Sequence, residues 1–416
     1  MTPPKIAIIG GKSSYPLVHW RRLLQVNAIP CNVFELDKDR RSRSQGGSLD
    51  LHEGSAQVAL REAGLFDQFM AVARPEGEVL KIYEPNGNLL LDESTGQGER
   101  RPDSFNGRPE VDRVQLRDML IDSLSPGTIQ WSRKLSAIKT TANGLDSAYD
   151  LHFADGTTET AFSLVVGADG TWSRVRPLLS DTAPQFSGIN GVDVKLSNID
   201  AVDATLSKRV GLGMCLTLGS NTTILSQRNG DGSVRSYGFM RLAEDWAQTC
   251  GIDWSRPAEA KNQFLGLYYK DFDQDSRNLI LKADNDSVTP RPMYMLPIGH
   301  TWPHRAGLTL IGDAAHIMPP FAGVGDALQL ARSLVACRDV CAKAAVRTHE
   351  RHLSDAVRDY EEAMFVRAEA YAKETWMYLN LFFHERGGHP MCEHFASEKK
   401  KQQTGVPETQ AVEVES

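Results

Sequence analysis

The chain of 416 residues is 41% hydrophobic and 24% charged, and it carries a net charge of −7 at pH 7. This length exceeds one typical hydrophobic core, so we expect two domains, or one large domain with a substantial insertion. The acidic balance gives no indication of nucleic-acid binding, and no apolar run is long enough to span a bilayer.

The six cysteines are scattered along the chain, with neither a zinc-binding spacing nor a dense disulfide pattern. We therefore predict no metal site. The N-terminus runs straight into an apolar segment without signal-peptide architecture, which predicts a protein of the reducing cytoplasm.

The N-terminal part of the chain predicts a β-α-β unit. Residues 5–11 form an apolar strand ending in glycine, residues 17–25 an amphipathic helix, and residues 30–35 a second strand ending in an acid. In a dinucleotide-binding fold, the acid at the end of the second strand binds the adenosine ribose, which makes Glu35 a candidate for that role.

The first turn of this unit departs from the glycine pattern G-x-G-x-x-G. Gly10 and Gly11 are present and are candidate cofactor contacts, but Lys12 and Tyr15 stand where the pattern needs its second and third glycines. Side chains there obstruct the approach of a pyrophosphate to the backbone amides. The residues alone therefore predict that such a cofactor binds weakly or not at all.

Two further segments combine charged residues with glycines or with a helix face. A charged run that includes Arg43 leads into Gly-Gly-Ser-Leu-Asp-Leu-His, which contains Gly47 and Asp50. A predicted helix then places Arg113 and Arg117 on one face, four residues apart. The alternative interpretations are a solvated charge run with a glycine turn, and a surface arginine pair.

The next segments predict structural elements of the fold and one more acidic residue that follows a strand. Residues 55–69 predict one amphipathic helix, and residues 128–131 and 149–153 predict strands. The apolar strand 164–167 then ends in Gly-Ala-Asp-Gly before a predicted helix start. Asp169 is therefore expected at the end of a buried strand.

From about residue 188 to residue 290, strands alternate with Gly, Asn and Asp turns, which predicts a second, sheet-based domain. Alternation along one strand turns Arg235, Tyr237 and Phe239 to the same side, and Gln227 precedes them in the same domain. We predict that Gln227, Arg235 and Tyr237 contact a substrate. A solvent-exposed face or a simple core face is the alternative.

Residues 308–325 join a predicted buried strand to a glycine-rich turn. Gly312 lets the chain turn so that Asp313 emerges at the strand's end, and the following prolines exclude a helix. Glycines further on allow backbone amides to approach a ligand before a helix begins. Candidate cofactor contacts in this turn are Asp313, Pro320, Gly323 and Gly325, and Phe321 is a candidate substrate contact. An ordinary strand-turn-helix connection with a capping aspartate is the alternative.

These elements predict an α/β fold class with a Rossmann-like cofactor-binding domain, a β-sheet substrate domain and a long C-terminal helix. The expected cofactor domain is discontinuous, over residues 1–180 and 290–345. Residues 181–289 are the expected substrate domain and residues 346–390 the C-terminal helix. The polar residues 395–416 are expected to be a disordered tail.

Three of the motifs resemble those of a known family. The Gly-Asp-Ala-Ala-His run with Pro-Pro-Phe-Ala-Gly-x-Gly, the Gly-Ala-Asp-Gly turn, and Gly-Gly-Ser-Leu-Asp-Leu-His are similar to motifs of the single-component aromatic-ring FAD monooxygenases. This is the para-hydroxybenzoate-hydroxylase-like family, and the resemblance is strongest to its tetracycline-inactivating branch. It covers roughly residues 5–380. The chain departs from it in the first glycine loop and after Gly325, where a short run before the next helix is missing.

The resemblance implies FAD-binding roles for the candidate residues. Asp313 would hold the ribityl chain of FAD, and Asp169 would lie near the pyrophosphate. The segment that contains Arg43, Gly47 and Asp50 would pass beside the flavin. Arg113 and Arg117 would hold the FAD phosphate and the flavin edge. The sequence has no second dinucleotide motif, so the resemblance implies that NAD(P)H docks on the flavin domain.

The function implied by the resemblance is that of an oxidoreductase of secondary metabolism or xenobiotic inactivation, acting as a monomer. It would insert one oxygen atom from O2 into a polycyclic aromatic or polyketide-like small molecule. The cofactor carries this chemistry, so we expect no catalytic residue from the chain. Two alternatives stay open: a flavin-free descendant acting as a binding protein or as a cyclase or isomerase, and a copy damaged by gene-model errors.

Overall fold

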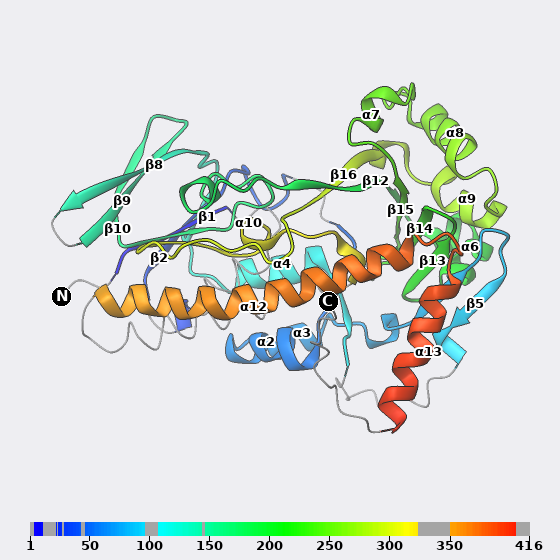
Figure 1. Cartoon of the computed structure of the whole chain (residues 1–416), viewed down its shortest axis with the longest axis horizontal. Helices are drawn as coiled ribbons and strands as arrows, with labels where there is room; N and C mark the ends of the chain where they lie inside the picture. Colours follow the sequence, from blue (N-terminus) through cyan, green and yellow to red (C-terminus); the bar gives the residue numbers. More distant parts are fainter. Residues whose placement is uncertain are drawn as a thin grey trace, which may run out of the picture.

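The computed structural model describes residues 4–10, 22, 24–26, 29–42, 46–95, 107–143, 146–322 and 350–404. Within these residues the framework consists of two large sheets and one long helix that extends along both of them (Figure 1). Among the described helices, none combines the length and the hydropathy needed to cross a bilayer.

A five-stranded parallel sheet is built from the segments that the sequence assigned to the cofactor domain. Its order is β17-β11-β1-β2-β7. The strands are β1 (Ile6–Ile9), β2 (Cys31–Phe34), β7 (Ile129–Gln130), β11 (Leu164–Gly167) and β17 (Leu308–Leu310). Strands β1, β11 and β17 are buried at every position, as expected for apolar runs in a parallel sheet covered on both faces.

A seven-stranded sheet forms the second half of the molecule, in the order β16-β12-β15-β14-β13-β4-β5. Its strands are β4 (Leu80–Tyr83), β5 (Leu89–Asp92), β12 (Gln185–Leu196), β13 (Met214–Leu218), β14 (Thr222–Arg228), β15 (Val234–Arg241) and β16 (Thr289–Met295). Helices α7 (Trp246–Thr249), α8 (Pro257–Tyr268) and α9 (Gln274–Leu281) lie at this end of the molecule (Figure 1). Their apolar side chains form one core with Val192, Val194, Ile224 and Met240 of the sheet.

Two smaller sheets and a set of short helices complete the fold. The two-stranded sheet pairs β3 (Ser48–Asp50) with β6 (Glu110–Asp112), and the three-stranded sheet contains β8 (Leu135–Asn143), β9 (Asp146–Phe153) and β10 (Thr158–Phe162). The short helices are η1 (Glu53–Gln57), α2 (Val58–Glu62), α3 (Phe66–Met70), η2 (Pro75–Gly77), η3 (Glu93–Thr95), α4 (Arg113–Asp122), η4 (Arg176–Leu178), α5 (Ile199–Val202), α6 (Ala204–Val210), η5 (Asn285–Ser287), α10 (Asp313–His316) and η6 (Pro320–Ala322).

The long helix α12 (Glu350–Phe382) is anchored at two places. Near its start, the Tyr360 hydroxyl donates to the carbonyl of Leu310 on β17 at 3.0 Å. At its end, the Thr223 hydroxyl of β14 donates to the carbonyl of Phe382 at 2.9 Å. The first half of α12 therefore belongs to the core of the parallel sheet and the second half to that of the seven-stranded sheet.

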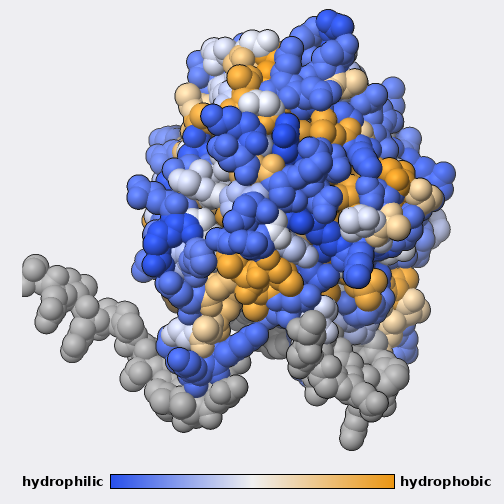
Figure 2. All heavy atoms as spheres, turned by 90° about the vertical axis from the view of Figure 1, so that its right-hand side faces the viewer, coloured by the Kyte–Doolittle hydropathy of each residue, from blue (hydrophilic) through white to orange (hydrophobic). Residues whose placement is uncertain are grey.

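The predicted fold class is confirmed, with two differences in where segments belong. Strands β4 and β5 precede residue 180 but pair into the seven-stranded sheet. Helix α13 (His389–Thr404) occupies the first part of the predicted disordered tail, so that prediction is wrong for residues 395–404. Side chains of α13 pack on the core beneath β4 and β5, and Met391 is buried there. The end of the molecule that carries α8, α9 and α13 is mainly hydrophilic, with small scattered apolar areas (Figure 2).

Candidate functional site

The candidate cofactor residues gather at one edge of the parallel sheet. Asp313 follows β17, Asp169 follows β11, Gly10 follows β1 and Glu35 follows β2. Because these neighbouring strands are parallel, their carboxyl ends lie at the same edge. Ligands of open α/β sheets bind outside this edge, so the structure brings four predicted site residues to the expected place.

Gly10 allows the end of β1 to lie directly against the end of β11. Its φ angle is +95°, and a Cβ added there would lie 2.5 Å from the Cα of Asp169 and 2.7 Å from the carbonyl oxygen of Ala168. Its amide donates to the carbonyl of Phe34 at 2.9 Å. Only glycine combines this backbone conformation with such close backbone contact.

Asp169 presents a buried hydrogen-bond acceptor at the strand edge. Its Oδ2 accepts from the amide of Arg174 at 2.7 Å, and burial raises the pKa of its carboxyl group. Its Oδ1 is buried and has no hydrogen-bond partner among the described residues. An acceptor in this state suits a ligand that brings its own hydroxyl or amide donor, as a dinucleotide does.

Arg176 fastens this turn to the segment that carries Asp313. Its side chain is buried, and its Nε donates to the carbonyl of Ala314 at 2.8 Å, its Nη2 to that of Asp313 at 3.0 Å and its Nη1 to that of Thr171 at 2.8 Å. The sequence assigned no role to this residue. The available signal was its position near the start of the turn that follows Gly-Ala-Asp-Gly.

The other residues predicted around the cofactor have varied surroundings. Glu35 is buried, and its Oε1 accepts from the amide of Asp37 at 2.9 Å. Asp313 is half-buried in the first turn of α10 and Pro320 is exposed, whereas Phe321, which was predicted as a substrate contact, is buried. The predicted contacts and the two departures from the glycine pattern that lie outside the described residues are Gly11, Arg43, Gly323, Gly325, Lys12 and Tyr15.

The paired glycines before β3 allow the chain to pass between two long side chains. A Cβ at Gly46 would lie 3.1 Å from the Cδ of Arg113, and a Cβ at Gly47 would lie 2.8 Å from the Oε1 of Gln227. Arg113 therefore lies beside the glycine turn, at the start of α4. Arg117, one helical turn later, lies 3.5 Å from the carboxylate of Asp118.

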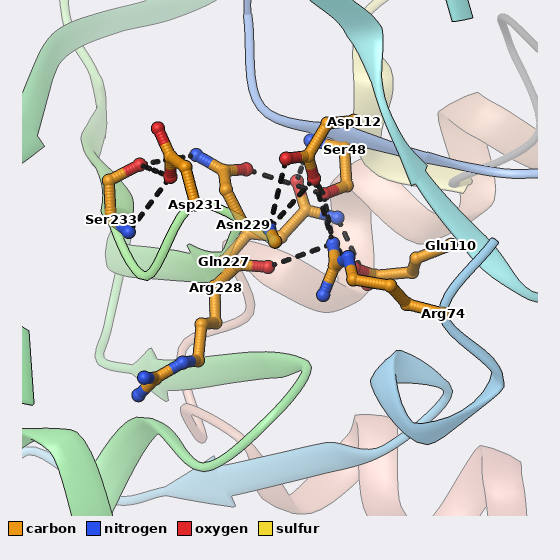
Figure 3. A network of polar contacts seen from close by, with 10 residues as sticks. Ser48, Arg74, Glu110, Asp112, Gln227, Arg228, Asn229, Asp231 and Ser233 are labelled. Atoms are coloured by element: carbon orange, nitrogen blue, oxygen red, sulfur yellow. Dashed lines mark hydrogen bonds and ion pairs between the residues drawn. The ribbon is translucent and has the colours of Figure 1, made fainter. Parts of the chain in front are cut away.

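A buried polar network joins β3 and β6 to the sheet domain (Figure 3). The amide of Ser48 donates to the Oε1 of Gln227 at 3.2 Å, and the Nε2 of Gln227 donates to Glu110 at 3.1 Å. Arg74 donates to Glu110 at 3.0 Å and to Asp112 at 3.1 Å. Both ends of the Gln227 amide thus bind protein groups, so the substrate contact predicted for Gln227 would have to replace one of these hydrogen bonds.

Two carboxyl groups of this network face each other across the β3–β6 pair. Asp50 lies opposite Glu110 in the register. Burial raises the pKa of Asp50 to about 6, and burial together with Asp50 raises the pKa of Glu110 to about 8. Arg108 near Asp50 and Arg74 beside Glu110 oppose these shifts. The pair therefore retains a proton at neutral pH.

The variant Glu110→Gln is expected to flatten the dependence of stability on pH. The pKa of Glu110 is about 8 in the folded protein and near 4.5 when unperturbed, so the folded state binds more protons between these values. Stability therefore falls as the pH rises through this window, and glutamine cannot titrate. Urea unfolding midpoints from pH 5 to pH 8 measure this slope. The exposed Glu76→Gln is the control, and an unchanged slope in Glu110→Gln contradicts the assignment.

In the seven-stranded sheet, the alternation predicted along β15 is confirmed. The register places Phe239 opposite Gly191 and Tyr237 opposite Asp193, which puts these residues on one face. Arg235 shares that face and binds Asp193 through two nitrogens, at 2.8 Å and 2.6 Å. The face packs toward Phe321 and the second half of α12.

Searches against known proteins extend these observations. No family model matches the chain. It is 30% identical over 437 residues to the monooxygenase asqM of Emericella nidulans, covering 92% of this chain and 96% of that protein. It is 28% identical over 432 residues to the monooxygenase penA of Penicillium thymicola, with the same two coverages.

Solved structures share the fold at lower identity. The Klebsiella pneumoniae HpxO structure complexed with FAD and uric acid has a TM-score of 0.72 at 15% identity, covering 96% of this chain and 93% of that one. The tetracycline destructase Tet(55) has a TM-score of 0.69 at 17% identity, covering 100% of this chain and 99% of that one. The full-length similarity to asqM, the shared fold and the strand-edge site agree, and the chain belongs to the family of FAD-dependent monooxygenases.

Proposed function

We propose that this protein is an FAD- and NAD(P)H-dependent monooxygenase that transfers one oxygen atom from O2 to a polycyclic aromatic or polyketide-like small molecule. The observation that carries the proposal is the buried Oδ1 of Asp169, which has no hydrogen-bond partner within the part of the chain that the structure describes and lies among the strand ends that also carry Gly10, Glu35 and Asp313. This arrangement fits a dinucleotide lying along the sheet edge. The proposal extends to a monomeric, cytoplasmic enzyme of secondary metabolism or xenobiotic inactivation.

Bound FAD would supply electron transfer from NAD(P)H and the activation of O2. The residues of the chain bind, orient and exclude water. Glu35, Asp169 and Asp313 would accept hydrogen bonds from the cofactor, and Arg176 holds the last two of these segments together. Phe321 is buried against Phe239 at 5.3 Å between ring centroids, which keeps this part of the site dry.

Asp313→Ala is expected to lower the affinity for FAD by about ten-fold to a hundred-fold, the loss of one charge-assisted hydrogen bond. The side chain is half-buried at a helix start, so the fold should persist. The purified protein is measured by visible flavin absorbance and by fluorescence titration with added FAD. Asp355→Ala, on the exposed surface of α12, is the matched control. Equal FAD affinity in Asp313→Ala and the control contradicts the cofactor assignment.

The same titration on the unaltered chain tests the weak binding expected from Lys12 and Tyr15. A dissociation constant for FAD in the micromolar range or lower shows that the other contacts compensate for the missing glycines. The absence of any binding favours the second candidate, a flavin-free member of this fold that uses its pocket to bind or isomerise a ligand. Lys12 and Tyr15 are the specific observation that keeps this candidate open.

A further inference from the structure

A serine, a histidine and a glutamate form a hydrogen-bonded chain between α12 and the loop before β17. Nε2 of His304 lies 2.9 Å from the hydroxyl oxygen of Ser354, and its Nδ1 lies 2.7 Å from Oε2 of Glu361. Ser354 and Glu361 are about two helical turns apart on α12, so they share one side of the helix. None of the three residues is among the cofactor or substrate candidates.

Glu361 fixes the orientation of the imidazole. Its Oε1 accepts from the indole of Trp302 at 3.0 Å and from the hydroxyl of Thr309 at 2.9 Å, which leaves Oε2 for His304. A carboxylate only accepts hydrogen bonds, so the proton of the neutral imidazole lies on Nδ1. Nε2 is therefore an acceptor, and the Ser354 hydroxyl donates to it.

The three side chains are ordered from the core toward the surface. The side chain of Glu361 is 2% exposed, that of His304 is 15% exposed, and Ser354 is half-buried. The acid is thus the most shielded member and the hydroxyl the most accessible one. This order suits a nucleophile, because the base is held by a buried group while the hydroxyl can meet a reagent.

The arrangement contains the parts needed for acyl transfer from an ester. The Oγ of Ser354 would attack the acyl carbon while Nε2 of His304 takes the hydroxyl proton. The new Oγ–C bond forms, the C–O bond of the ester breaks, and the alcohol or phenol leaves with the bonding electron pair. The proton on Nε2 then passes to this leaving group or to water, so the step needs neither an oxidant nor a reductant.

We propose that Ser354 is a nucleophilic serine that takes a small acyl group from an activated ester, with His304 as its general base. Glu361 is a positioning residue, since it acts through the imidazole. The acyl group is small because Ser354 is half-buried. This activity needs no flavin and goes beyond the monooxygenase function.

The test treats the full chain with para-nitrophenyl acetate. Release of nitrophenolate is followed by absorbance, and the acetylated residue is identified by peptide mass spectrometry. A general base accelerates such a step by about a hundred-fold or more, so Ser354 should be acetylated about a hundred-fold faster than Ser123. Ser123 is the matched comparison, because it is also half-buried and its hydroxyl donates to the carbonyl of Leu120, which is not a base.

Three variants assign the reaction to its residues. Ser354→Ala should abolish the initial release of nitrophenolate, and His304→Gln should slow the acetylation of Ser354 about a hundred-fold, because glutamine can form hydrogen bonds but cannot take the proton. Ser123→Ala should leave the release unchanged. Circular dichroism of each variant monitors the fold.

Glu361→Gln tests the positioning role with a spectroscopic signature. The glutamine amide would donate to Nδ1 of His304, which moves the imidazole proton to Nε2 and removes the acceptor of the Ser354 hydroxyl. Nitrogen NMR of labelled histidine should show this change of tautomer, together with slower acetylation of Ser354. A tautomer that stays unchanged contradicts the role given to Glu361.

The decisive comparison is made within the unaltered protein. If Ser354 is acetylated no faster than Ser123, the inference is overturned, and this result does not depend on the folding of any variant. Equal acetylation of Ser354 in the unaltered protein and in folded His304→Gln also overturns it.

Discussion

Gly10→Ala is expected to destabilise the folded protein by about 3 kcal/mol or more, from backbone strain and overpacking together. The added Cβ would lie 2.5 Å from a backbone atom of Asp169, and backbone atoms of a central sheet cannot turn aside as a flexible side chain can. β1 pairs with β11 on one side and with β2 on the other. Relief of the clash therefore requires these strands to separate where the cofactor edge is formed.

Gly156→Ala is the control that separates clash from backbone strain. Gly156 also has a positive φ, of +83°, but an added Cβ there would meet nothing within 4 Å. Its cost should be only the strain of a left-handed conformation, about 1 to 2 kcal/mol. Urea unfolding of both variants measures the difference. Equal losses of unfolding free energy in the two variants would show that close contact between Gly10 and Asp169 does not destabilise Gly10→Ala.

Glu361→Ala is expected to lower the free energy of unfolding by about 3 kcal/mol or more, because three buried or half-buried donors would lose their acceptor. Oε1 of Glu361 accepts from the indole of Trp302 at 3.0 Å and from the hydroxyl of Thr309 at 2.9 Å. Oε2 lies 2.7 Å from Nδ1 of His304. Glu361 thereby ties α12 to β17 and to the loop before it.

The matched variant is Glu369→Ala, eight residues further along the same helix. The side chain of Glu369 is 45% exposed, and among the described residues its ion pair is with Lys373 one turn away, so its removal should cost within about 0.5 kcal/mol. Chemical unfolding followed by circular dichroism and by tryptophan fluorescence compares the two variants. Similar losses of unfolding free energy in the two variants would show that the three hydrogen bonds of Glu361 do not stabilise the fold.

The strand-end motifs could be predicted because their signal is local. An apolar run followed by glycine and an acid determines both the strand and the place of the acid, as at Asp169 and Asp313. The helix predicted over residues 55–69 failed for a local reason as well. Gly64, at a φ of +67°, ends α2 after Glu62, and α3 begins afresh at Phe66.

The pairing of strands that are far apart in the chain could not be predicted from the sequence pattern. Nothing local shows that β4 pairs with β13, since the two strands are more than a hundred residues apart in the chain. The same limit applies to Gln227, whose partners Ser48 and Glu110 come from distant segments. A strand residue of a sheet face can bind a ligand or another part of the chain, and only the packed structure shows which of these occurs.

Helix α12 fixes the distance between its hydrogen bond to β17 and its hydrogen bond to β14. Tyr360 and Phe382 are separated by roughly six helical turns, which brings both contacts to nearly the same side of the rod. Each inserted or deleted residue would turn one contact by about 100° relative to the other. Substitutions at exposed positions of this helix should therefore be tolerated. The gain or loss of a single residue between the two anchors would turn one anchor contact away from its sheet.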